Sequence, residues 1–552
     1  MIFWGYMSLP SNFFSTQSVL VVDDIDTIRS AVKGMLQMLG CKDIATANNG
    51  ERALELCIHH QYDFILCDFN LGKGKDGYQL FEELKLRKLL KNSTVFILIS
   101  AETAVQIIHG LVELQPDDYL LKPFSYKKLE SRLIKAVEKR RILGEIYEAV
   151  LKKDYEEALS VCAKITEKHS HYSLAVKRLK GEVLLKLNRH KEALVLYDSA
   201  LAIREFGWAR LGKAITFYHL GELPKAIIIL KQLAEVLETR VEALNWLANI
   251  FVKQNRLEQV EETLIESVKV SPKNIPRQRA LANFSVLNED WDVALRCFKT
   301  VVTNTRFSIH ENIEHHLNYV HCLIDKAQTE TELQRAKLFS QAQAALRNAS
   351  NRFDKSIFSE LERVACARMA ILRDALYDAN NILQECNQEV VLDCGKESAL
   401  HLAKAWFELG DYEHYQTLMD LLPEDKIEED DETIENISET LRIKKASEAS
   451  QVKIAKLLEL NQQGLGLYKS GLYQASTAVF LEAFQLVPNN LQLSLNLAQS
   501  ISKGWPANET YLLKKVTIKR CVNIIESQPK PLEKQTKARY DSFEYDLKKL
   551  IH

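Results

Sequence analysis

Acidic, hydroxyl and ammonium side chains stand directly after short apolar runs in the first quarter of the 552-residue chain. They are Asp23 and Asp24, Asp68, Ser100 and Lys122, which follow the runs 18–22, 62–67, 94–99 and 118–121. Carboxylates that lie close together repel each other unless a cation neutralises them. Several hard oxygen ligands suit Mg²⁺, which also pairs with phosphate oxygens. If the fold gathers these residues, they predict a magnesium-dependent phosphate chemistry around Asp68.

The elements that must position these residues are strands alternating with helices. A fifth short run, 43–47, joins the four above, and helical patterns over about 25–39, 50–59 and 78–90 separate the runs. Such alternation predicts a doubly wound, five-stranded parallel sheet over residues 18–140, with helices on both faces. In such sheets the site lies beyond the carboxyl ends of the strands, where all five residues would meet.

A GxGxxG pattern at Gly72, Gly74 and Gly77 raises the alternative of a dinucleotide-binding loop. That loop should follow the first strand, with an acidic residue about 20 positions further on. Here the glycines follow the third strand, Asp68 stands at the mouth of the loop, and the apolar run 95–99 lies where the acid should be. We therefore expect the glycines to shape the loop beside Asp68.

Residues 18–140 resemble the receiver (CheY-like, flavodoxin-like) domain of two-component response regulators. The resemblance rests on the order and approximate spacing of Asp23, Asp24, Asp68, Ser100, Lys122 and Pro123. It implies that Asp68 accepts a phosphoryl group from the phosphohistidine of a histidine kinase or phosphotransfer protein. Receivers that fold but are never phosphorylated usually lose the acceptor, the lysine or the acidic pair, and this chain keeps all of them.

The resemblance also implies roles for the neighbours of Asp68. The implied Mg²⁺ ligands are Asp24, Asp68 and the backbone carbonyl of Asn70, with Asp23 acting largely through water. Lys122 would pair with the phosphoryl oxygens, Ser100 would hydrogen-bond to them, and the Lys122–Pro123 peptide is expected to be cis.

Three further positions bear on switching and phosphate lifetime. Tyr119 stands where the family often has an aromatic switch, although a ring packed on the surface explains it equally well. Asn70 and Glu102 stand at positions that tune dephosphorylation, and they favour a short-lived phosphate. The family often has proline where Gly72 stands, which leaves the shape of this loop open.

From residue 141 onward the pattern is helical and repeats itself. One copy places Gly181, Leu184, Ala193, Tyr197 and Ala200 in an order that recurs downstream. The spacing resembles the tetratricopeptide repeat, a helix-turn-helix of about 34 residues that stacks into a superhelix. The expected divisions are a tail (1–17), the receiver (18–140), repeats (141–305), degenerate repeats or helical hairpins (306–422), an acidic linker or hinge (423–450), and a last repeat with capping helices (451–552).

Composition excludes several classes of function. A net charge of −2 and sparse basic segments argue against nucleic acid, and the absence of an apolar run of about 18 residues argues against a membrane span. Ten cysteines without a CxxC pattern fit a reducing cytoplasm. The spacing of His310, His315, His316 and His321 is poor for one helix face, so we expect solvated or core-edge histidines instead of metal ligands.

The combination predicts a phosphorylation-gated output that binds protein, and no enzyme activity beyond the receiver's own phosphorylation and dephosphorylation. The leading hypothesis is an adaptor or inhibitor that binds another signalling protein through its repeats. One alternative is a phosphate sink that drains a shared kinase. Another is a platform for homodimer formation.

Overall fold

The computed structural model describes the whole chain except residues 1–9, 11, 102–115, 423–432, 529–531 and 552. The chain divides into two compact units. The first comprises residues 1–281 and 303–311, and the second comprises residues 282–302 and 312–552.

The first unit begins with the expected parallel sheet. Its strands are β1 (Ser18–Val22), β2 (Asp43–Ala47), β3 (Phe64–Asp68), β4 (Val95–Ser100) and β5 (Asp118–Leu121). They are all parallel and lie in the order β2-β1-β3-β4-β5. The prediction of a five-stranded α/β fold is confirmed.

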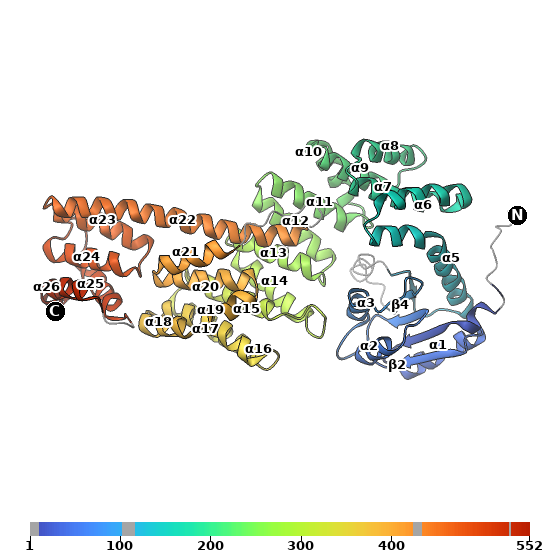
Figure 1. Ribbon diagram of the computed structural model, residues 1–552, viewed down its shortest axis with the longest axis horizontal. Helices are drawn as coiled ribbons and strands as arrows, with labels where there is room; N and C mark the ends of the chain where they lie inside the picture. The colour runs from blue at the N-terminus through green and yellow to red at the C-terminus, as the bar shows by residue number, and fades with distance from the viewer. Residues whose placement is uncertain (1–9, 11, 102–115, 423–432, 529–531, 552) are drawn as a thin grey trace. The chain divides into compact units, whose positions relative to one another are not determined.

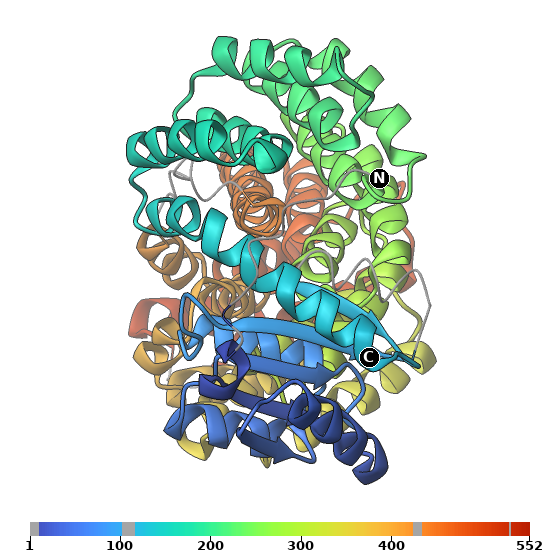
Figure 2. The same ribbon diagram turned by 90° about the vertical axis from the view of Figure 1, so that its right-hand side faces the viewer.

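Helices cover both faces of this sheet, as Figures 1 and 2 show. The described ones are α1 (Asp26–Met38), α2 (Gly50–His59), α3 (Gly77–Leu86) and α5 (Tyr126–Leu151). Side chains of α1 and α5 pack with one set of strand residues, and side chains of α2 and α3 pack with the other. Every residue of β1, β3 and β4 is buried, because the two helical layers leave these strands no solvent-facing side.

The rest of the first unit is a stack of helices. After α5 come α6 (Tyr155–Lys168), α7 (Ser173–Lys186), α8 (His190–Leu201), α9 (Gly207–His219), α10 (Leu223–Ala234), α11 (Arg240–Lys253) and α12 (Leu257–Val270). Each helix contacts the next, and α5, α7, α9 and α11 also contact one another in series. This arrangement is what repeats need in order to bury the apolar faces that a single pair leaves exposed.

The second unit is also helical. Its elements are the end of α13 (Ile275–Leu287), α14 (Trp291–Asn304), α15 (Ile313–Ala327), α16 (Glu332–Ser350), α17 (Lys355–Ile371), α18 (Leu376–Glu385), α19 (Gln388–Asp393), α20 (Lys396–Leu409), α21 (Tyr412–Leu421), α22 (Ile434–Lys469), α23 (Tyr473–Leu486), α24 (Leu491–Lys503), α25 (Tyr511–Glu526) and α26 (Lys534–Ile551). Within the described residues, no helix combines the length and apolar content that a membrane crossing requires.

Three boundaries differ from the expected divisions. No linker separates the sheet from the repeats, because α5 runs unbroken across residue 140. In the expected tail, residues 13–16 form a 3-10 turn whose phenylalanines pack on the core of the sheet. In the expected hinge over 423–450, the described residues from 434 onward belong to the 36-residue helix α22, which Thr433 caps. Helix-forming residues after the acidic run explain this last difference.

Candidate functional site

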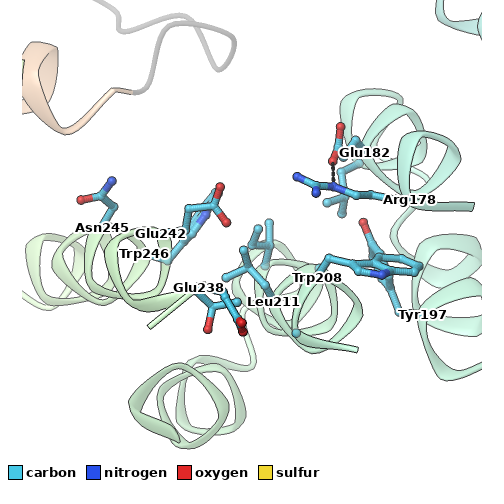
Figure 3. A pocket seen from close by; sticks show the side chains of 14 residues that line it. Arg178, Glu182, Tyr197, Trp208, Leu211, Glu238, Glu242, Asn245 and Trp246 are labelled. Carbon is cyan, nitrogen blue, oxygen red and sulfur yellow. Dashed lines mark hydrogen bonds and ion pairs between the residues drawn. The ribbon is translucent and has the colours of Figure 1, made fainter. Parts of the chain in front are cut away.

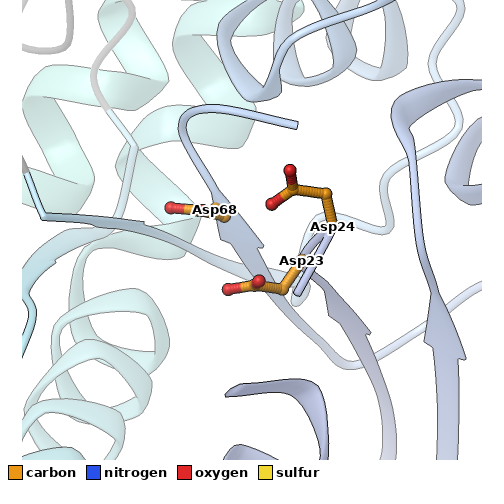
Figure 4. Close-up of side chains that lie close together, drawn as sticks. All are labelled: Asp23, Asp24 and Asp68. Atoms are coloured by element: carbon orange, nitrogen blue, oxygen red, sulfur yellow. The ribbon is translucent and has the colours of Figure 1, made fainter. Parts of the chain in front are cut away.

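Three carboxylates lie together at the carboxyl ends of adjacent strands. Asp23 and Asp24 follow β1, and Asp68 ends β3. One ligand atom from each of the three carboxylates lies within 4.8 Å of the others (Figure 4). Asp23 and Asp68 are buried, at 3% and 7% exposure, whereas Asp24 is exposed to solvent. The chain order of these acids alone had suggested this cluster, and the β1–β3 pairing produces it.

The ammonium group of Lys122 neutralises part of this cluster. Its Nζ lies 2.7 Å from Asp23 Oδ2 and 2.9 Å from Asp68 Oδ2. The Lys122 backbone N–H donates a hydrogen bond of 2.8 Å to the carbonyl of Ser100, which ties the end of β5 to the end of β4. The Lys122–Pro123 peptide is cis, as predicted.

Burial and charge both act on these side chains. Burial raises the pKa of Asp68 above its usual value, although the hydrogen bond from Lys122 opposes the shift. For Lys122, burial lowers the pKa, but the hydrogen bonds to Asp23 and Asp68 outweigh burial and leave the pKa raised. The lysine is therefore held in its charged form, next to a carboxylate whose charged form burial disfavours.

The other predicted site residues that the structure describes lie in or just after β3, β4 and β5. Ser100 ends β4 and is 2% exposed, and its backbone pairs with Leu121 on β5. Tyr119 is half-buried and packs on the core formed with α2 and α3. Asn70 is exposed, and its Oδ1 accepts a hydrogen bond of 3.2 Å from the N–H of Gly72. Glu102 lies outside the described residues.

The glycines after Asp68 serve the loop that leads into α3. A Cβ on Gly77 would lie 2.1 Å from the carbonyl oxygen of Asp68, so only glycine fits at that point. Gly74 has a φ of +101°, a conformation that other residues rarely adopt. Asp76 then caps α3, with its side chain and that of Gln79 each accepting a hydrogen bond from the other residue's backbone N–H.

This same loop contacts the repeat portion of the first unit, which no sequence pattern indicated. Lys273 Nζ lies 3.1 Å from Asp76 Oδ2 and 5.1 Å from the centre of the Phe69 ring. The Nζ of Lys75, a residue only 5% exposed, donates a hydrogen bond of 2.7 Å to the carbonyl of Phe307 and also pairs with Glu83.

The first two turns of α3 add two more contacts of this kind. Gln79 Nε2 donates a hydrogen bond of 3.0 Å to the carbonyl of Asn304. On the next turn, Glu82 Oε1 lies 3.0 Å from His310 Nε2. We call Lys273 together with residues 304–310 the docking segment. It is the part of the repeats that contacts the receiver immediately downstream of Asp68.

The histidines near residue 315 belong to the second unit and are more buried than expected. His315, His316 and His321 are 6%, 7% and 2% exposed, so the expectation of solvated or core-edge histidines was wrong for these three. The ring of His321 stacks on that of His401 at 3.8 Å, beside the fully buried Arg368. Within the described residues, the acids at 23, 24 and 68 are the one group of potential metal ligands.

Comparison with known proteins supports the resemblance. The family model of the response regulator receiver domain matches residues 19–134, which contain every residue predicted for the acceptor site. The chemotaxis protein CheY-3 of Vibrio cholerae is 31% identical over 121 residues, which is 22% of this chain and 92% of that protein. The Bacillus subtilis regulator PhoP, whose name describes alkaline phosphatase synthesis, is 29% identical and matched over 34% of this chain and 78% of its own length.

Two further matches differ in how much of the matched protein this chain covers. The probable transcriptional regulator ycf27 of Cyanidium caldarium is 36% identical over 115 residues, so the chain spans 44% of that relative's length. A solved structure of the chemotaxis protein CheY4 of Vibrio cholerae is 25% identical, covers 22% of this chain and 98% of its own, and has a TM-score of 0.20.

Proposed function

We propose that this chain, which belongs to the response regulators with a receiver domain, accepts a phosphoryl group on Asp68 and thereby controls protein binding by its helical repeats. The phosphoryl donor would be a phosphohistidine on a histidine kinase or phosphotransfer protein in the cytoplasm. The observation that carries the proposal is the contact between the docking segment and the loop that follows Asp68.

The site suits phosphoryl transfer to a carboxylate. As an oxygen of Asp68 bonds to phosphorus, the bond from phosphorus to the donor's histidine nitrogen breaks. Negative charge spreads over three phosphoryl oxygens during this step, and preorganised positive groups stabilise it. Lys122 already lies 2.9 Å from Asp68 and would pair with one of those oxygens.

The acidic cluster also fits a Mg²⁺ ion. Three carboxylates offer oxygens within 4.8 Å of one another, while a single lysine contacts only two of them. Asp24 and Asp68 would hold the ion directly with the backbone carbonyl of Asn70, and Asp23 would act through water. A bound Mg²⁺ would neutralise the phosphoryl oxygens, and Ser100 would donate a hydrogen bond to one of them.

Control of the output requires that phosphorylation change the free energy of one arrangement of the repeats relative to another. Phe69, Lys75 and Asp76 lie within eight residues of the acceptor and contact the docking segment. A phosphoryl group on Asp68 adds charge and acceptor oxygens at the start of this loop. It would therefore alter the loop conformation on which the docking segment rests.

The proposal is tested by capturing partners on the full chain from a lysate of its source cells. Wild type with Mg²⁺ and beryllofluoride, which stands in for the phosphoryl group, is compared with the acceptor variant Asp68→Asn. Lys273→Met serves as a variant in which the docking contact is weakened while the acceptor site is intact. We expect one partner that binds in only one state of the wild type, and whose binding in Lys273→Met no longer depends fully on beryllofluoride.

Equal capture of the same partner in both states would contradict the proposal and make the repeats a constitutive tether. The phosphate-sink function would then lead. Capture of a second copy of this chain in one state alone would support the dimerisation platform.

A further inference from the structure

A half-open cavity of about 470 Å³ lies among the repeat helices of the first unit (Figure 3). It opens between α7, α8, α9 and α11. These helices follow the receiver in the sequence. The lining residues that carry its chemistry are Arg178, Glu182, Trp208, Glu238, Glu242 and Trp246. We call it the tryptophan pocket. Its volume is in the range of sites that bind small molecules or a few side chains.

Close helix packing fixes the floor of this pocket. Tyr197 is only 2% exposed. A Cβ on Gly181 would come within 2.7 Å of its ring, and a Cβ on Gly212 within 2.2 Å, so a glycine on α7 and a glycine on α9 make room for it. Gly181 and Tyr197 had appeared in the sequence as repeat signatures. Tyr197 and Gly212 also line the pocket.

Two tryptophans form the apolar walls and are held by other rings. Trp208 stacks on Phe206 with ring centres 5.8 Å apart and meets Tyr197 edge-on at 6.3 Å. Trp246 meets Tyr218 edge-on at 5.1 Å. Both tryptophans are half-buried, so part of each indole stays open to the pocket. Preorganised aromatic walls of this kind bind with little loss of side-chain freedom.

The side chains that line the pocket carry a net negative charge. Three glutamates and one arginine line it, a formal net charge of −2 (three acids less one base). Arg178 Nε pairs with Glu182 Oε1 at 3.0 Å, and Glu238 and Glu242 lie on the opposite side of the pocket (Figure 3). Both of these glutamates are exposed to solvent. An anionic ligand would be repelled here, and a cation would be attracted.

Open indole faces beside carboxylates suit one kind of side chain. A lysine or arginine can lay its apolar stem against a ring while its charged head reaches a carboxylate. The ring itself also attracts the cation. We propose that the tryptophan pocket binds a lysine- or arginine-bearing segment of the partner protein. This inference rests on the proposed function, because it names the chemistry of the partner that the repeats bind.

The test uses the full chain and two synthetic peptides of equal length. One carries arginines alternating with leucines in a glycine and serine background, and the other carries glutamate at each arginine position. Binding is measured by calorimetry with and without Mg²⁺ and beryllofluoride. We expect the arginine peptide to bind and the glutamate peptide to bind at least about tenfold more weakly, since several exposed charge pairs change sign.

Matched variants locate the binding. The double variant Glu238→Gln and Glu242→Gln should weaken the arginine peptide by about five- to tenfold, because two rim charges are removed. Glu167→Gln with Glu262→Gln removes the same charge from exposed positions outside the pocket and should leave the affinity unchanged. Equal affinity for the two peptides, or equal effects of the two double variants, would overturn the proposal. Binding of arginine methyl ester as tight as that of the peptide would also overturn it, because it would assign the pocket to a small cation.

Failure of this inference can be told apart from failure of the proposed function. Peptide binding that depends on Glu238 and Glu242 but is identical with and without beryllofluoride would support the tryptophan pocket as the binding site. It would contradict control of binding by phosphorylation of Asp68. If capture of a partner depends on phosphorylation but is unaffected by the double variant Glu238→Gln with Glu242→Gln, the proposed function stands. The tryptophan pocket is then not the binding site.

Discussion

At the scale of single residues, Lys122 supplies the positive charge that partly neutralises the acids of the acceptor site. It is the cation that contacts both buried carboxylates within the described residues. Lys122→Met would leave Asp23 and Asp68 without that partner and remove a cation from the path of the developing charge.

We expect Lys122→Met to slow phosphorylation of Asp68 by acetyl phosphate and Mg²⁺ on the order of 10²-fold, the usual effect of removing one such electrostatic group. Intact-protein mass spectrometry measures the rate. Lys91→Met is the control, since Lys91 pairs with Asp63 at 3.0 Å away from the cluster. A rate equal to that of Lys91→Met would show that Lys122 plays no part in the transfer.

The second prediction for a single residue concerns Gly77. The Gly77→Ala variant would press a methyl group against the Asp68 carbonyl, at 2.1 Å in the unrelaxed structure. We expect it to lower the free energy of unfolding by about 1–3 kcal/mol, as overpacking does.

Gly144→Ala is the matched control in the same compact unit. Gly144 lies inside α5, and a Cβ there would meet nothing within 4 Å. Because alanine favours helix over glycine, this control should raise the free energy of unfolding by up to about 1 kcal/mol. Urea unfolding followed by circular dichroism measures both variants. Equal shifts in the two would refute the close approach at Gly77.

At the scale of elements, a buried polar network joins four helices of the second unit. Arg368 on α17 is fully buried and pairs with Asp325 on α15 at 2.5 Å and with Glu408 on α20. His321 and His401 stack beside it, and their pKa values are lowered well below the usual 6.5, first by burial and then by neighbouring positive charge. The charged groups that face these two rings are Arg368, Asp325, Lys404 and Arg442.

The network predicts a pH dependence of stability. Folded, both histidines stay neutral near pH 6, whereas in the unfolded chain they take up protons below about pH 6.5. The unfolded state then binds more protons, so its relative stability rises. The histidines' contribution is therefore fully present above pH 6.5 and is lost as pH falls below it. Urea midpoints measured from pH 8 to pH 5.5 should decline below 6.5 for wild type and decline less for His321→Gln. A wild-type midpoint that is flat over this range would contradict the assignment.

At the scale of the whole molecule, the receiver could be predicted closely from sequence because its signals are local. Four of the five strands, β1, β3, β4 and β5, are short apolar runs that end at or just before a site residue. The parallel order of these strands therefore gathers Asp23, Asp68 and Lys122. The chemical roles of these residues remain predictions from the resemblance to receiver domains.

The contacts that sequence could not supply are long-range. Lys273 meets Asp76 across nearly 200 positions of chain, and a solvated lysine in a turn carries no mark of its partner. The burial of His321 likewise depends on His401 and Arg368, which come from other helices. Helix α22 was missed over residues 434–450 because an acidic run beside a proline dominated the local pattern.

The measurement that tests the central claim most directly is hydrogen exchange of the docking segment in the full chain. Backbone amides of residues 304–310 are compared with and without Mg²⁺ and beryllofluoride, in wild type and in Asp68→Asn. If Asp68 and the docking segment are coupled, exchange there should change by about fivefold or more in wild type, the lower end of typical coupling energies, and should not change in Asp68→Asn. Exchange in this segment that is identical in both states of the wild type, while the loop at 69–76 responds, would contradict the account.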